Sequence, residues 1–150
     1  MRARQIRENV HWMGAVDWDR RLFDSLIPLP DGTSYNAYLI QGSDKTVLVD
    51  SVDPAKADTL LTQLQNVPQV DYVIAHHAEQ DHSGSIPLVL ERYPEARVIA
   101  TPKGVEMLID HLEGAAPLTP ESSRSDFPCR LIERDSCGPP PDRASSGDKS

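Results

Sequence analysis

Residues 72–87, with the sequence YVIAHHAEQDHSGSIP, decide the fold and the candidate site of this chain. The first four residues are apolar and predict a short buried strand. The closing SGSIP, followed by LVL, predicts a turn that opens a helix. Between them, five side chains that can bind metal fall within seven residues: His76, His77, Glu79, Asp81 and His82. We therefore expect a strand-to-helix loop whose rigid flanks hold side chains for chemistry.

The spacing of these side chains predicts two metal sites. In an extended backbone, His77 and Glu79 point to the same side, so an imidazole nitrogen and a carboxylate oxygen reach one ion. Asp81 and His82 follow a bend and are placed to serve a second ion nearby. Two divalent ions that each take an imidazole and a carboxylate need this mixture of donors. The alternative interpretation is a polar surface loop in an acidic protein.

Residues 77–84, HAEQDHSG, resemble the His-x-Glu-x-Asp-His signature of the flavodiiron proteins. These proteins, also called A-type flavoproteins, are a branch of the metallo-β-lactamase superfamily. Residues 11–19 and 32–40 are similar to the opening strands of that family, and residues 101–104 to the segment after its next strand. Ordinary zinc hydrolases of the superfamily carry His where this chain has Glu79, and a carboxylate there suits iron better.

The resemblance implies a mixed α/β fold, the amino-terminal half of a metallo-β-lactamase αββα sandwich. It also implies a non-haem diiron oxidoreductase that reduces O2 to water or NO to N2O. His77 and Glu79 would bind one iron, and Asp81 and His82 would bind the other. No further residue is assigned a catalytic role.

Two more residues are expected to support the ligands without binding metal themselves. The resemblance implies that Asp50 orients the ligand loop. A helix-capping or turn Asp, close to Asp53, is an equal alternative for this residue. His76 precedes the first His of the signature, so we expect it beside the ligands rather than among them.

The resemblance also implies a cofactor set and partners. In the family, electrons reach the two Fe ions from FMN on a flavodoxin-like domain, and the electron donor is a protein such as rubredoxin or a flavin domain. Head-to-tail homodimers bring one subunit's flavin to the other's iron pair. This sequence lacks the family's downstream His, bridging Asp and final His, and it lacks the flavodoxin-like domain. We therefore expect a truncated flavodiiron core that is not active alone.

Two alternatives stay open. The first is a hydrolase of the same superfamily, in which two Zn ions activate water. The second is a non-catalytic fragment, or a half-domain that another polypeptide completes.

Hydrophobic periodicity predicts strands that alternate with helices, which gives an α/β layer architecture. The predicted strands cover residues 10–17, 35–41, 46–50, 70–75 and 97–100. The predicted helices cover residues 53–66, 86–93 and 101–112. Together they give an expected partial metallo-β-lactamase-like domain over residues 1–113. Residues 114–150 are rich in Pro and Ser, so we expect a disordered tail.

Composition argues against several functions. The net charge of -8 disfavours a surface for nucleic acid or anionic membranes. No apolar run approaches the ~20 residues that span a bilayer, and the amino terminus does not have the pattern of a secretory signal. We expect a cytoplasmic protein.

Overall fold

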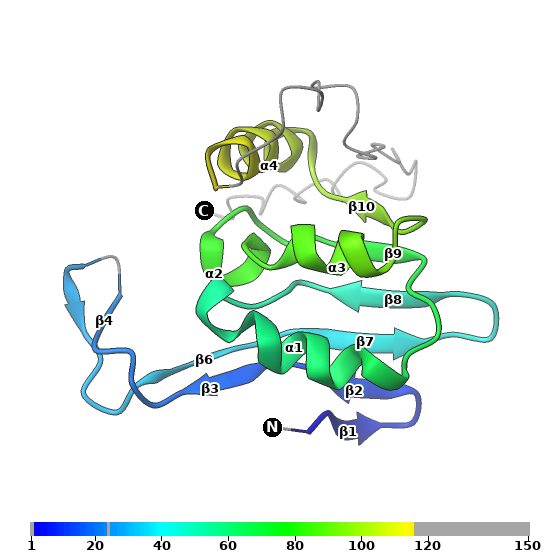
Figure 1. The fold of residues 1–150 in the computed structure, drawn as a ribbon, viewed down its shortest axis with the longest axis horizontal. Helices are drawn as coiled ribbons and strands as arrows, with labels where there is room; N and C mark the ends of the chain where they lie inside the picture. The colour runs from blue at the N-terminus through cyan, green and yellow to red at the C-terminus, as the bar shows by residue number, and fades with distance from the viewer. Residues whose placement is uncertain (1, 24, 116–150) are drawn as a thin grey trace, which may run out of the picture.

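The computed structural model describes residues 2–23 and 25–115. Its centre is a six-stranded sheet in the order β1-β2-β7-β8-β9-β10 (Figure 1). The strands are β1 (Arg4–Arg7), β2 (Val10–Trp12), β7 (Tyr38–Gln41), β8 (Thr46–Val49), β9 (Tyr72–Ile74) and β10 (Arg97–Ile99). The last three run parallel to one another, and the other pairings are antiparallel. The carboxyl ends of β8, β9 and β10 therefore meet at one edge of the sheet.

Helices connect the parallel strands. Between β8 and β9 lie η1 (Pro54–Lys56), α1 (Ala57–Gln63) and η2 (Leu64–Asn66), between β9 and β10 lie α2 (Gln80–Ser83) and α3 (Ile86–Arg92), and α4 (Pro102–Ala115) follows β10. Figure 1 shows α1 and α3 lying across the same face of the sheet. One buried cluster joins this face to the helices, and its members include Leu39, Leu48, Val73, Val98, Leu60, Leu64, Ile86 and Val89.

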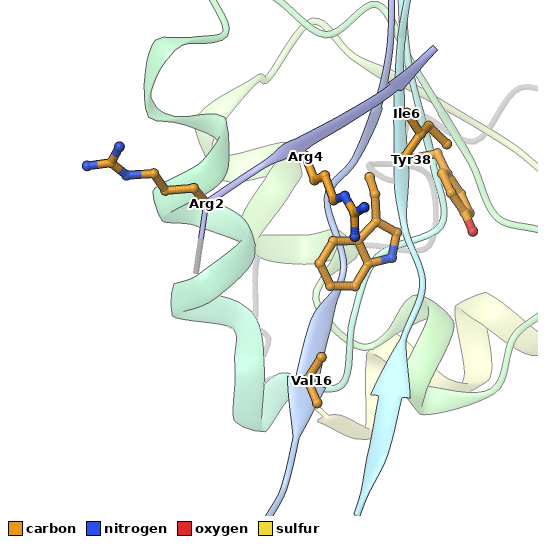
Figure 2. A pocket seen from close by; sticks show the side chains of 6 residues that line it. Arg2, Arg4, Ile6, Val16 and Tyr38 are labelled. Atoms are coloured by element: carbon orange, nitrogen blue, oxygen red, sulfur yellow. The ribbon is translucent and has the colours of Figure 1, made fainter.

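The opposite face of the sheet is also apolar. Strand register places two rows of side chains across it: Trp12, Tyr38, Val49, Ile74 and Ile99 in one row, and Val10, Ile40, Val47, Tyr72 and Arg97 in the other. At the β1 end lies an open hollow of about 500 Å³, lined by Arg2, Arg4, Ile6, Trp12, Val16 and Tyr38. Figure 2 shows this hollow from close by. Sheets that are apolar on both faces are built to be covered on both, which agrees with the predicted αββα sandwich.

Two predicted strands are each divided in the structure. The predicted strand at residues 10–17 is divided into β2 and β3 (Ala15–Asp17). The predicted strand at residues 35–41 is divided between the end of β6 (Thr33–Tyr35) and β7. β3 pairs with β6 in a separate two-stranded sheet. Both segments are interrupted beside Gly14, where a Cβ would lie 2.0 Å from the Tyr35 carbonyl oxygen. Only a glycine allows this close approach.

Other predictions differ in smaller ways. β1 was not predicted, because its four residues are all exposed and have no apolar alternation. The predicted connection at residues 20–30 contains a short hairpin of β4 (Leu22–Phe23) and β5 (Ile27–Pro28). The predicted helix at residues 53–66 is a composite of η1, α1 and η2.

The last predicted helix extends to Ala115, so the first two residues of the predicted tail are helical. The rest of that tail, residues 116–150, lies outside the described residues. Among the helices that the structure describes, none is long and apolar enough to cross a bilayer.

Candidate metal centre

The predicted metal-binding loop follows β9 at the carboxyl edge that β9 shares with β8. The backbone N–H of Asp50, directly after β8, donates to the Ile74 carbonyl at 2.8 Å. This hydrogen bond places Asp50 beside the start of the loop. The bend predicted before Asp81 coincides with the start of α2 at Gln80, so Asp81 and His82 lie on a four-residue helical turn.

The four predicted ligands form two neighbouring pairs. His77 Nε2 lies 3.5 Å from Glu79 Oε2, and His82 Nε2 lies 3.6 Å from Asp81 Oδ2. The rings of His77 and His82 are adjacent, with centroids 4.0 Å apart. The structure therefore places the two pairs next to each other, with the Glu79 side chain 63% exposed at the outer edge.

Both imidazole rings are oriented through their other nitrogen. His82 Nδ1 lies 3.1 Å from Asp50 Oδ2, and a carboxylate only accepts, so Nδ1 carries the hydrogen. His77 Nδ1 lies 3.0 Å from His76 Nδ1 in a contact where one ring donates to the other. Each His thus presents Nε2 to a carboxylate, and for His82 the hydrogen on Nδ1 leaves Nε2 for a metal.

Both carboxylate oxygens of Asp50 contact residues of the metal-binding loop. Oδ1 accepts the backbone N–H of His76 at 2.7 Å, while Oδ2 contacts His82. The helix cap that was the alternative role belongs instead to Asp53, whose Oδ1 accepts the Ala55 N–H at 2.9 Å. Asp50 has a φ of 59°, in the left-handed region that costs a non-glycine residue free energy.

Two buried serines, for which the sequence predicted no role, hold the backbone of the loop. The backbone N–H and the hydroxyl of Ser51 both donate to the His82 carbonyl oxygen, at 2.7 and 2.8 Å. The hydroxyl of Ser83 shares its one hydrogen between the Ala78 carbonyl oxygen, at 3.0 Å, and the Glu79 carbonyl oxygen, at 3.1 Å. Their only sequence signal was position, directly after Asp50 and directly after the donor cluster.

A charged cluster fixes η1 behind the loop. Lys56 Nζ lies 3.1 Å from Asp17 Oδ1, and Arg20 Nη1 lies 3.1 Å from Asp53 Oδ2. Burial raises the pKa of Asp17, but the hydrogen bond from Lys56 and other favourable contacts outweigh it and hold this pKa below its ordinary value. Burial, together with the charges of Asp53 and Asp17, raises the pKa of Tyr35 to about 12. The cluster therefore ties η1 to β3 and β6.

The donor chemistry of each pair suits one divalent ion. Two ligands about 2.1 Å from an ion, at ordinary coordination angles, lie about 3.0–3.4 Å apart, close to the separations of 3.5 and 3.6 Å seen here. Mixed nitrogen and oxygen donors suit iron or zinc. Within residues 2–23 and 25–115, no three His, Cys, Asp or Glu side chains are arranged to hold one ion. Each pair is therefore short of the three protein ligands that catalytic metal sites usually have.

Comparison with known proteins supports the resemblance drawn from the sequence. The metallo-beta-lactamase superfamily model matches residues 30–147. The nitric oxide reductase of Moorella thermoacetica is 39% identical over 110 residues, which cover 71% of this chain and 27% of the relative. The chain thus spans about a quarter of the length of the curated relatives it matches.

Solved structures agree. The rubredoxin oxygen:oxidoreductase of Desulfovibrio gigas aligns with a TM-score of 0.73 and 28% identity, over 87% of this chain and 30% of that one. The flavodiiron protein of Giardia intestinalis aligns with a TM-score of 0.68 and 28% identity, over 77% and 29%. Because the superfamily model covers more than half of the sequence and these structures share its fold, the chain belongs to the metallo-beta-lactamase superfamily and resembles its flavodiiron proteins.

Proposed function

We propose that residues 77–82 form the amino-terminal part of the dinuclear iron site of a flavodiiron-type oxidoreductase. One observation carries this proposal: two His–carboxylate pairs, at 3.5 and 3.6 Å, lie side by side with imidazole centroids 4.0 Å apart. Relatives named as a nitric oxide reductase and a rubredoxin oxygen:oxidoreductase support reduction of NO to N2O, or of O2 to water.

Each pair has a separate role in this proposal. His77 and Glu79 hold one iron, and Asp81 and His82 hold the other. When bound, the iron pair supplies the electrons and the binding positions for a diatomic substrate. Glu79 is 63% exposed at its side chain, whereas Asp81 and His82 are 23% and 26% exposed.

Asp50 and His76 orient these ligands in the same proposal. Asp50 accepts a hydrogen from the ring of His82, and the ring of His76 contacts that of His77. Contacts of this kind fix the tautomer and direction of a metal-binding imidazole.

The rest of the machinery lies outside the described residues. The remaining ligands come from beyond this loop, and electrons come from FMN on a flavin domain that receives them from a donor such as rubredoxin. Homodimerisation and a cytoplasmic location are part of the same proposal. The first is implied by the family resemblance and the second is expected from the sequence, and this chain covers only about a quarter of its relatives.

A zinc hydrolase is the second candidate, because the superfamily model does not separate it from the flavodiiron branch. Each His–carboxylate pair also suits zinc. The carboxylate of Glu79 makes the site more oxygen-rich and favours iron. Nitrogen and oxygen sites generally bind Zn²⁺ more tightly than Fe²⁺ whatever their function, so affinity does not separate the two candidates. Hydrolytic activity of the zinc-loaded chain would favour the second candidate.

Anaerobic iron reconstitution of the full chain, with measurement of bound metal, tests the proposal. We expect about two irons per chain from the two donor pairs, less iron in Glu79→Ala, and parental binding in Glu95→Ala, an exposed Glu after α3. Full iron retention by Glu79→Ala would show that the loop is assigned wrongly. Substoichiometric metal in the parent would favour a non-catalytic fragment or partner-dependent half-domain.

A further inference from the structure

The junction between α2 and α3 is held by a residue from another part of the chain. α2 ends at Ser83 and α3 begins at Ile86. Carbonyl groups at the end of one helix and N–H groups at the start of the next have no partner within their own helices. The His82 carbonyl and the Ser85 N–H are two such groups.

The hydroxyl of Ser51 joins these two groups. It donates to the His82 carbonyl oxygen at 2.8 Å and accepts the Ser85 N–H at 3.3 Å. The backbone N–H of Ser51 adds a second bond to the same carbonyl, at 2.7 Å. Ser51 is 0% exposed, so water has no access to replace these bonds.

We propose that Ser51 is a positioning residue that caps both helices and fixes the direction in which Asp81 and His82 face their ion. Asp50 holds the ring of His82, and Ser51 holds its backbone, so two consecutive residues fix both parts of one ligand. The metal-binding part of this inference rests on the proposed function, whereas the capping part does not.

The effect is largest at one of the two donor pairs. His77 is contacted by the ring of His76, and the Glu79 carbonyl accepts from the hydroxyl of Ser83. Neither contact includes Ser51. Loss of its hydroxyl therefore weakens the Asp81–His82 pair most. It reaches the His77–Glu79 pair only through the backbone N–H groups of His82 and Ser83, which donate to the Glu79 carbonyl oxygen at 2.9 Å.

Ser85 provides a matched control for Ser51→Ala. It is 1% exposed, lies on the same junction, and has a hydroxyl oxygen without a hydrogen-bond partner among the described residues. In an anaerobic Fe²⁺ titration of the full chain, we expect Ser51→Ala to bind one of its two irons about 10–100-fold more weakly. Ser85→Ala should match the parent. Mössbauer spectra of Ser51→Ala should show one ferrous signal changed and the other retained.

Amide hydrogen exchange of the metal-free chain tests the capping separately. We expect the amide at position 85 to exchange on the order of tenfold faster in Ser51→Ala than in the parent or Ser85→Ala. Unchanged exchange, equal weakening of both irons, or the same loss in Ser85→Ala would overturn the inference. Faster exchange in Ser51→Ala, together with a parent that binds no iron, would keep the cap and reject the proposed function.

Discussion

At the scale of single residues, Asp50 combines backbone strain with two hydrogen bonds to the loop. Its φ of 59° is tolerated by Asp and Asn better than by most residues. Strained residues of this kind persist where the surrounding structure holds them in place, and they concentrate at functional sites. Asn at this position therefore preserves the backbone and changes only the chemistry.

We predict that Asp50→Asn folds but binds iron about 10–100-fold more weakly. The amide oxygen can still accept the His76 N–H, but the amide NH2 then faces His82 Nδ1. That donor forces the ring hydrogen onto Nε2, the nitrogen needed for the ion. Anaerobic iron titration, with urea unfolding in parallel, measures both effects. Asp58→Asn, an exposed change in α1, is the control, and parental affinity in Asp50→Asn would contradict the prediction.

At the scale of elements, the turn that carries Asp81 and His82 packs tightly against η1. A Cβ at Gly84 would lie 2.6 Å from the Gln80 carbonyl oxygen and 2.7 Å from Pro54 Cδ. The φ of Gly84 is -64°, which any residue adopts. The glycine is therefore required by the close packing of α2 on η1 and not by its backbone conformation.

Gly84→Ala should lower the free energy of unfolding by about 1–3 kcal/mol, because a rigid proline ring and a backbone oxygen cannot both move aside. Urea unfolding measures this change. Gly104→Ala is the matched control in α4, where the atom nearest to an added Cβ is Thr101 Oγ1, at 3.0 Å, which belongs to a side chain. Similar losses in both variants would show that the packing of α2 on η1 is not the cause.

At the scale of the whole molecule, stability is concentrated in the centre of the sheet. β8 is paired on both sides and contributes Leu48 to the buried cluster. The hairpin of β4 and β5 pairs only within itself, and Leu26 in its turn and Ile27 in β5 are 81% and 55% exposed. Figure 1 shows β4 projecting away from the body of the sheet.

Hydrogen exchange should therefore differ between these strands. We predict that the amides of β8 exchange only through global unfolding, whereas those of β4 and β5 exchange through local opening. Increasing urea should accelerate the β8 amides strongly and the hairpin amides little, which site-resolved exchange measures. Equal urea dependence in both places would mean that the hairpin is part of the cooperative core.

Much of this molecule follows from local sequence patterns. The apolar run before His76 predicted β9, and periodicity predicted a helix from residue 53, where the structure contains η1 with Asp53 as its N-cap. The five donors in seven residues located the candidate site and supported the family resemblance that the comparisons confirm. These features depend on neighbouring residues, whose geometry is fixed by short stretches of backbone.

Only the tertiary structure decided how the loop is held. Asp50 contacts His82 across 32 residues of sequence, and Ser51 does so across 31. The division of two predicted strands likewise depends on Gly14 meeting Tyr35. Such contacts arise because parallel strands end at one edge and bring distant segments together, and no local pattern records which side chains meet there.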